Sequence, residues 1–369
     1  MTTAAEELPA VALSALSTLS CSVSPGFGGL GRHFEELIEL TRALRGGDFE
    51  YRCPQPDAAD VAAGLARPVT AVLGGGRFLL FTPLRWNYAW TTYAAGRTFD
   101  VAVARSINGR RDGLMGFSGQ SLASFRRARA AGYAALGLLS PTCHVDHVMA
   151  QQRVAMAQYP VDKGWINSAT RRRALREYDL ADVIFVSSQH QRATFLAGGV
   201  PDTKLVTVPL ASHPRFRRRE AVPSGATFEI AYVGRFDLAK GLPVLLDAFR
   251  AAAEPSWRLT LQGEFCTRRI RRYLQQRVAG DARIQLVPAG DPLPVLQRSH
   301  VFVHPSYDDG FGYGPIEAMA VGVPVIVTDQ TGMKERITEG VDGFVVPAGD
   351  VDALAEQLRA VASGVGATS

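Results

Sequence analysis

The 369-residue sequence has few cysteines, few lysines and no long apolar run. Its four cysteines (Cys21, Cys53, Cys143 and Cys266) are widely spaced and form no C-x-x-C pair. This spacing argues against a disulfide framework or a zinc module, and it favours a reducing compartment such as the cytoplasm. No apolar run approaches about 18 residues, and no charged leader precedes a short apolar segment. The sequence therefore predicts neither a membrane span nor a signal peptide.

Neither sign of charge dominates. The 40 Lys and Arg residues against 35 Asp and Glu residues give a net charge of +5, which is too small to predict nucleic-acid binding. Hydrophobic residues make up 47% and charged residues 20%, so the chain is an ordinary globular protein and not disordered or fibrous. Its length predicts two domains. Only four of the 40 basic residues are Lys, so a Lys inside a motif stands out.

The first half alternates short apolar runs with helical patterns. A helical pattern covers residues 32–45. The apolar runs predict buried strands at 11–23, 100–104, 134–139 and 183–186. Prolines and arginines then punctuate 208–225, which indicates a linker.

The second half continues the same alternation. Its predicted strands lie at 228–233, 257–261, 284–287, 301–303, 323–328 and 343–346. Strands that alternate with helices are typical of parallel sheets covered by helices. We therefore predict an α/β fold of two doubly wound domains, residues 1–210 and residues 211–369.

The first glycine-rich loop fits a dinucleotide-binding fingerprint. Gly26, Gly28 and Gly31 form G-x-G-x-x-G between an apolar run and a helical pattern. An acidic residue about 20 residues further on would hold a ribose. Asp48 and Glu50 lie near that distance, although they stand in a poor strand pattern. A tight turn and a loop that a substrate approaches closely are the other interpretations.

Two cations mark a loop in the second half. Arg235 follows the predicted strand 228–233, and Lys240 follows five residues later, just before a helical pattern. An Arg and a Lys on one loop at the carboxyl edge of a sheet form a clamp for a diphosphate. The alternative is a solvated pair of charges.

A second glycine-rich loop, residues 310–314, follows the predicted strand 301–303 and leads into a helix with Pro315 at its start. Free N–H groups at such a helix start can bind an anion or a sugar hydroxyl. Asp309 and Glu317 flank the loop, with seven residues between them. The helix dipole alone would also favour a carboxylate such as Glu317 near the first turn.

Taken together, these motifs resemble the nucleotide-sugar half of the retaining GT-B glycosyltransferases of family 4, also called glycosyl transferases group 1. The resemblance rests on Val233-Gly234-Arg235 with Lys240-Gly241, on DGFGYGPIEAMA from Asp309, and on 322–326 and 340–347. It is strong over about residues 180–350. It implies a GT-B fold in which residues 1–210 form an acceptor-side Rossmann-like domain and residues 211–369 bind the nucleotide sugar across a cleft.

The resemblance also implies roles for single residues. Arg235 and Lys240 would hold the donor diphosphate, and Glu317 would bind the ribose. Asp309 stands where the family has a Glu that contacts hydroxyls of the transferred sugar, so this chain is one methylene shorter there. The loop would present backbone N–H groups to the sugar or phosphate from Gly310, Phe311, Gly312, Tyr313 and Gly314.

In the first half, the resemblance implies that Gly28, Gly29 and Gly31 meet the donor phosphate and the acceptor, and that His144 lies near the sugar. The motif from His144 to His147 also suggests a metal, but two residues separate the histidines and no other ligand cluster appears in the sequence. The family does without a metal. We expect none here, and no cofactor besides the nucleoside diphosphate sugar, with UDP or GDP as its nucleotide.

The predicted activity is sugar transfer, with retention, to a hydroxyl of a glycan, a lipid-linked sugar or a small molecule. His144, Arg235, Lys240 and Asp309 are its predicted catalytic residues. A degenerate protein that binds without turnover, suggested by Asp309, and a nicotinamide oxidoreductase that uses residues 26–31 are the alternatives. The arginine-rich stretches predict solvated faces or, alternatively, peripheral contact with the inner membrane face at 171–173, 215–219 and 268–272.

Overall fold

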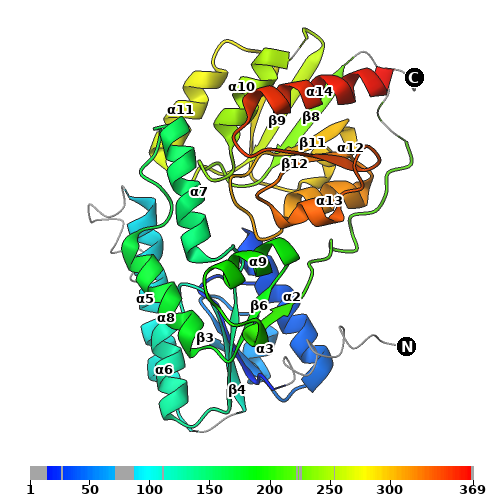
Figure 1. Cartoon of the computed structure of the whole chain (residues 1–369). Helices are drawn as coiled ribbons and strands as arrows, with labels where there is room; N and C mark the ends of the chain where they lie inside the picture. The colour runs from blue at the N-terminus through cyan, green and yellow to red at the C-terminus, as the bar shows by residue number, and fades with distance from the viewer. Residues whose placement is uncertain are drawn as a thin grey trace. The chain divides into compact units, whose positions relative to one another are not determined.

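The computed structural model describes residues 15–25, 28–70, 87–109, 112–221, 223, 227–252 and 254–366. The chain forms two compact units, each built on a parallel sheet (Figure 1). The first unit contains the chain up to His147 together with Ile166–Pro209. The second contains Val148–Trp165 together with the chain from Leu210 onward.

The first sheet has the strand order β3-β2-β1-β4-β5-β6-β7, so the order reverses between β1 and β4. Its strands are β1 (Thr18–Ser20), β2 (Glu50–Cys53), β3 (Ala66–Pro68), β4 (Gly113–Phe117), β5 (Ala135–Leu139), β6 (Val183–Val186) and β7 (Leu205–Thr207). The described helices of this unit are α2 (Gly28–Arg45), α3 (Ala58–Ala62), α5 (Tyr88–Ser106), α6 (Leu122–Ala130), α8 (Ser168–Leu180), α9 (Gln189–Ala197) and the short η2 (Asp202–Lys204).

One strand prediction in the first half is wrong. Residues 100–104 lie inside α5, because Phe99 and Val103, four residues apart, are both fully buried on one face of that helix. The strand of this region is β4, which the sequence analysis missed because glycines interrupt its apolar run. Gly116 is needed there, since a Cβ would lie 2.1 Å from the Ser121 Oγ atom.

The second sheet has the order β10-β9-β8-β11-β12-β13. Its strands are β8 (Phe228–Val233), β9 (Trp257–Gly263), β10 (Ile284–Pro288), β11 (Val301–His304), β12 (Val325–Thr328) and β13 (Gly343–Val346). All six strand predictions are confirmed, with ends that agree to within two residues. The remaining helices are α7 (Val145–Gln158), α10 (Leu242–Ala252), α11 (Arg268–Val278), α12 (Leu293–Arg298), α13 (Tyr313–Val321), η3 (Gly332–Arg336) and α14 (Val351–Gly366).

Helices cover both faces of the second sheet. Ile230 and Tyr232 pack on one face with α10 and α14, which lie side by side (Figure 1). Ala231, between them, packs on the other face with α12 and α13. A parallel strand buried on both faces explains why β8 is apolar at nearly every position. Within the described part of the chain, no helix has the length and apolarity needed to cross a membrane.

Most of α7 packs with the second unit, whereas the sequence analysis kept residues 148–165 with the first domain. Ala155 on this helix is buried in the core of the second unit. The Tyr159 hydroxyl donates a hydrogen bond to Asp247 on α10 at 2.7 Å. Because these contacts join residues about 90 positions apart, local sequence patterns do not reveal them.

Candidate functional site

The predicted residues of the second unit lie where its strand order reverses. Along the chain, β8 leads to β9 and β10 on one side, whereas β11, β12 and β13 lie on the other. Such a reversal leaves a crevice at the carboxyl ends of the strands, where α/β proteins bind ligands. Arg235 and Lys240 follow β8, and Asp309 and residues 310–314 follow β11. The fold therefore brings both predicted loops to one edge of one sheet.

Close backbone contacts hold these two loops together. Gly241 has a φ of +65°, and a Cβ there would lie 1.8 Å from the carbonyl oxygen of Pro305. Only glycine permits this approach. The Tyr307 N–H donates to the Ala239 carbonyl at 2.8 Å, and the Ser306 hydroxyl donates to the same oxygen at 3.1 Å. The position of one loop is thus fixed by the other.

Asp309 lies between Lys240 and His304. The Lys240 Nζ atom is 2.5 Å from Asp309 Oδ2, and His304 Nε2 is 2.9 Å from the same oxygen. Burial acts to raise the pKa of Asp309, but the Lys240 ammonium and the His304 hydrogen bond outweigh it and hold that pKa well below its usual range. Burial lowers the pKa of His304. Its ring is therefore neutral at pH 7, and we assign the Nε2–H as the donor to the carboxylate.

Asp237 orients both cations of the loop after β8. Its Oδ2 atom is 3.0 Å from the Arg235 guanidinium, and its Oδ1 accepts the Lys240 backbone N–H at 3.0 Å. The Asp237 side chain is buried, whereas that of Arg235 is 48% exposed. The sequence analysis gave no role to Asp237 or to His304. His304 could have been identified from the sequence, because it stands at the carboxyl end of an apolar strand, where α/β proteins bind ligands.

Helix α13 begins beside the end of β8. A Cβ at Gly314 would lie 3.0 Å from the Val233 carbonyl oxygen, so this helix start packs closely on that strand. Gly312, with a φ of +105°, is the N-cap, and Pro315 is the third residue of the helix rather than the first. The first turn contains no acidic residue. The positive end of the helix dipole therefore favours an anion at this helix start, beside Arg235.

The other predicted residues of this loop are mostly buried. Phe311 is 2% exposed and belongs to the apolar core, so its side chain is not available to a ligand. Tyr313 packs partly against the same core. Glu317 is buried in the second turn of α13. Its role toward a ribose stays a prediction.

A cavity of about 460 Å³ adjoins the loop after β8. Phe236, the neighbour of Arg235, lines it together with Phe265, Val287 and other residues at the carboxyl ends of β9 and β10. The Arg271 guanidinium lies 5.1 Å from the centre of the Phe265 ring. Glu264 and Gln275 also line the cavity, and its aromatic and apolar walls suit a planar ring. The sequence analysis did not identify this cavity.

In the first unit, the glycine loop leads directly into α2. Gly28 begins the helix with a φ of +64°, whereas Gly26 lies outside the described residues. At Gly28 and Gly29 a Cβ would meet no atom of the described residues within 4 Å, and Gly31 is buried. The first turn of α2 contains no acidic residue. This helix start follows β1 at the point where the first sheet reverses.

The second strand of the first sheet does not favour nicotinamide binding. Residues 48–52 looked like a poor strand, but Glu50 begins β2 and is buried. Its carboxylate pairs with Arg52 and, at 3.1 Å, with Arg67. A ribose-binding acid would stand at the carboxyl end of this strand, where Cys53 lies instead.

His144 lies in the interior of the first unit and is 1% exposed. Its ring centre is 5.2 Å from that of Tyr178 and 5.4 Å from that of Phe195. A Cβ at Gly198 would lie 2.5 Å from this ring. Burial lowers the pKa of His144, which keeps the ring neutral at pH 7. Its catalytic role stays a prediction that this position does not favour.

His147, the second histidine of the same motif, lies close to His190, which is distant in the sequence. Cys143, His147 and His190 each offer a donor atom within 4.8 Å of the others, which makes them the one such group among the described residues that could share a metal ion. His147 and His190 stand in the first turns of α7 and α9. The positive ends of two helix dipoles disfavour a cation there. We keep the expectation that the protein uses no metal.

Solved structures share the fold over nearly the whole chain. Sucrose-phosphate synthase from Thermosynechococcus elongatus matches with a TM-score of 0.66 at 21% identity, over 94% of this chain and 90% of that one. Anabaena HepE in complex with UDP-glucose matches with a TM-score of 0.62 at 14% identity, over 96% and 90%. Likeness at such identity shows the fold alone. The predicted fold class, GT-B with two Rossmann-like units, is confirmed.

The sequence itself matches a family over the second unit. Residues 227–363 match the family described as Glycosyl transferases group 1, which confirms the resemblance for this segment. The capsular polysaccharide biosynthesis glycosyltransferase CapM of Staphylococcus aureus is 33% identical over 136 residues, 36% of this chain and 36% of CapM. The match thus covers about a third of that relative's length.

Proposed function

We propose that the protein is a retaining glycosyltransferase that moves a sugar from a nucleoside diphosphate sugar to an acceptor hydroxyl. The observation that carries this proposal is the meeting of Arg235, Lys240 and the start of α13 at the reversal point of the second sheet. The family match over residues 227–363 and the GT-B fold support the same class of enzyme.

In this proposal, Arg235, Lys240 and the positive end of the α13 dipole stabilise the charge that grows on the departing diphosphate. Each charge-assisted hydrogen bond contributes about 1.5–3 kcal/mol. Asp309 accepts hydrogen bonds from hydroxyls of the transferred sugar, and Glu317 binds the ribose. Gly310 and its neighbours supply backbone donors.

The nucleotide base would occupy the cavity beside Phe236 and Phe265, where aromatic and apolar walls suit a planar ring. UDP is the first candidate nucleotide, because HepE, which shares this fold, is known in complex with UDP-glucose. GDP is the second.

We further propose that retention follows a same-face path, in which a donor phosphate oxygen helps to deprotonate the acceptor. Asp309 is held by Lys240 and His304, which lower its pKa and so weaken it as a base, and for that reason we do not propose it as the group that deprotonates the acceptor. The cations and the helix start would neutralise the diphosphate without a metal.

The acceptor, in our proposal, binds the first unit beside Gly28, Gly29 and Gly31, where a Cβ at Gly28 or Gly29 would meet no atom of the described residues within 4 Å. It is a glycan, a lipid-linked sugar or a small molecule. We propose a cytoplasmic enzyme, supported by four free cysteines, that contacts the inner membrane face peripherally through its arginine-rich surfaces.

A protein that binds the donor without turnover is the second candidate. Asp309, one methylene shorter than the family's Glu and held by both Lys240 and His304, favours it. The variant Asp309→Glu separates the two candidates. Donor binding without measurable transfer by wild type, together with transfer by Asp309→Glu, would identify a degenerate protein.

The test of the proposal is a thermal-shift panel of UDP, GDP, ADP, TDP and NAD on wild type, Lys240→Ala and the control Lys163→Ala. A ligand at 100 times its dissociation constant adds about 2.7 kcal/mol to the free energy of unfolding. We expect one nucleoside diphosphate to stabilise wild type and the control but not Lys240→Ala. Stabilisation by NAD alone, unaffected by Lys240→Ala, would overturn the proposal.

A further inference from the structure

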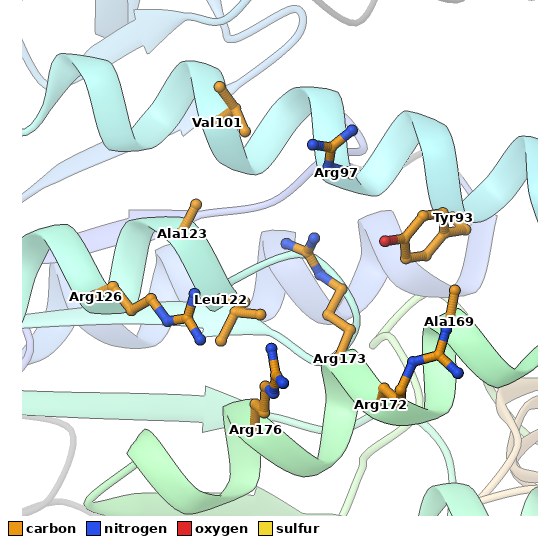
Figure 2. A pocket seen from close by; sticks show the side chains of 10 residues that line it. All are labelled: Tyr93, Arg97, Val101, Leu122, Ala123, Arg126, Ala169, Arg172, Arg173 and Arg176. Atoms are coloured by element: carbon orange, nitrogen blue, oxygen red, sulfur yellow. The ribbon is translucent and has the colours of Figure 1, made fainter.

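The first unit contains a basic cavity on three helices that are distant in sequence. The cavity has a volume of about 310 Å³ and is formed by α5, α6 and α8 (Figure 2). Its five arginines are Arg97 on α5, Arg126 on α6, and Arg172, Arg173 and Arg176 on α8. On α8, Arg172 and Arg173 stand four and three residues before Arg176, so each of them lies on the same side of the helix as Arg176.

The described residues neutralise only part of this positive charge. Arg173 is buried, and it pairs with Asp100 and, at 3.1 Å, with Glu177. At the start of α6, the Glu177 carboxylate also accepts the backbone N–H of Ser121, and the Asp100 carboxylate accepts that of Ser124. The described part of the chain supplies no ion-pair partner for the four exposed arginines, Arg97, Arg126, Arg172 and Arg176.

We infer that this cavity binds a phosphate or diphosphate group of a ligand. Figure 2 shows the guanidiniums of Arg97, Arg126, Arg173 and Arg176 around one space between the helices. Like charges that face one another are stabilised by a multiply charged anion. A carboxylate would neutralise one guanidinium, whereas a phosphate dianion neutralises two and a diphosphate more.

The side chains that line the cavity also favour a phosphate group as the ligand. Guanidiniums bind phosphate oxygens through two parallel hydrogen bonds, which a lysine cluster does not offer. Tyr93, four residues before Arg97 on α5, brings a hydroxyl to the rim, and Val101 and Leu122 give one side an apolar surface. The inference does not rest on the proposed transfer reaction, because all these residues belong to the first unit.

The test is a calorimetric titration with inorganic pyrophosphate. It is made in a Lys240→Ala chain, so that the proposed donor site does not contribute, and compares that chain with one that also carries Arg126→Gln and Arg176→Gln. We expect the dissociation constant to rise at least about tenfold, since two of the charged contacts are lost. Arg173 is left in place because it holds Asp100 and Glu177.

The matched control is Arg269→Gln with Arg272→Gln on α11, which removes the same charge from exposed positions of the other unit. It should leave the dissociation constant unchanged. If Lys240→Ala does not fold, the titration is made in the otherwise unaltered chain. There, the Arg126→Gln and Arg176→Gln pair should remove one pyrophosphate site from the stoichiometry.

Vesicle flotation distinguishes the two sources of such a group. Binding to phosphatidylcholine vesicles that contain phosphatidic acid, lost with Arg126→Gln and Arg176→Gln, would assign the site to a lipid headgroup. Pyrophosphate binding without vesicle binding would assign it to a soluble phosphate ester. The inference is overturned if neither probe binds, or if the α11 control loses as much pyrophosphate binding as the cavity variant. Either failure leaves the proposed donor site untouched.

Discussion

The two basic sites of the molecule differ in how their charge is balanced. In the second unit, the mostly buried Lys240 faces the mostly buried Asp309. In the first unit, Arg173 alone among the cavity arginines is buried with carboxylate partners. Removing one member of a buried pair leaves the other charge stranded, whereas exposed charges are removed at little cost. Stability and ligand binding should therefore be coupled in the second unit and separable in the first.

The largest effect is expected for Lys240→Ala. It removes a cation from the proposed diphosphate site and leaves the Asp309 carboxylate with His304 alone. We expect sugar transfer to fall by about 100-fold or more. The free energy of unfolding should fall by about 3 kcal/mol. Transfer kinetics and denaturant titration measure the two effects. Lys163→Ala, an exposed lysine, is the control, and equal behaviour of both variants would contradict the account.

The contact between the two loops is tested by a pair of glycine variants. Gly241 and Gly280 both have a positive φ, but only at Gly241 would a Cβ collide with another backbone segment. Gly280→Ala should cost about 1–2 kcal/mol from its backbone conformation alone. Gly241→Ala should cost clearly more, about 3 kcal/mol or above. Equal shifts of the denaturation midpoint would show that the loops do not need this close approach.

The buried ion pair between Lys240 and Asp309 predicts that the stability of the fold depends on pH. Because the folded-state pKa of Asp309 is depressed, its carboxylate stabilises the fold above the unfolded pKa, near about 4. That contribution is lost as the pH falls toward the folded-state pKa. At pH 7 the free energy of unfolding of wild type should exceed that of Asp309→Asn by about 3 kcal/mol. This difference should shrink below about pH 4. Denaturant titrations across this range measure it. A difference that does not change with pH would argue against a buried ion pair.

The smallest effect is expected in the first unit. Arg126→Gln with Arg176→Gln should change the free energy of unfolding by less than about 0.5 kcal/mol, even though pyrophosphate binding weakens. The melting temperature of the double variant in buffer without phosphate checks this. A large loss of stability would mean that these arginines hold the helices together, and the contrast between the two sites would disappear.

Much of the second unit was predictable from its sequence. Each strand is an apolar run that ends in a glycine-rich or charged loop, and parallel strands bring those loops to one edge. Arg235, Lys240, Asp309 and residues 310–314 were identified in this way. The contact between Lys240 and Asp309 was not, because it joins residues 69 positions apart and depends on how the two loops pack.

The first unit was less predictable, because its distinctive features come from contacts between distant helices. Residues 100–104 looked like a strand but supply one face of α5. The burial of His144 depends on Phe195 and Gly198, about 50 positions away. Each arginine of the basic cavity, taken by itself, looks like part of a solvated face. Only the packing of α5, α6 and α8 joins them.

The central claim is that the carboxyl edge of the second sheet binds a donor diphosphate. Its most direct test compares UDP with UMP by calorimetric titration of wild type and of Arg235→Gln with Lys240→Ala. If the two cations hold the second phosphate, wild type prefers UDP over UMP by at least about tenfold, and the double variant loses that preference but still binds UMP. Equal binding of UDP and UMP by wild type, or an unchanged preference in the double variant, would contradict the claim.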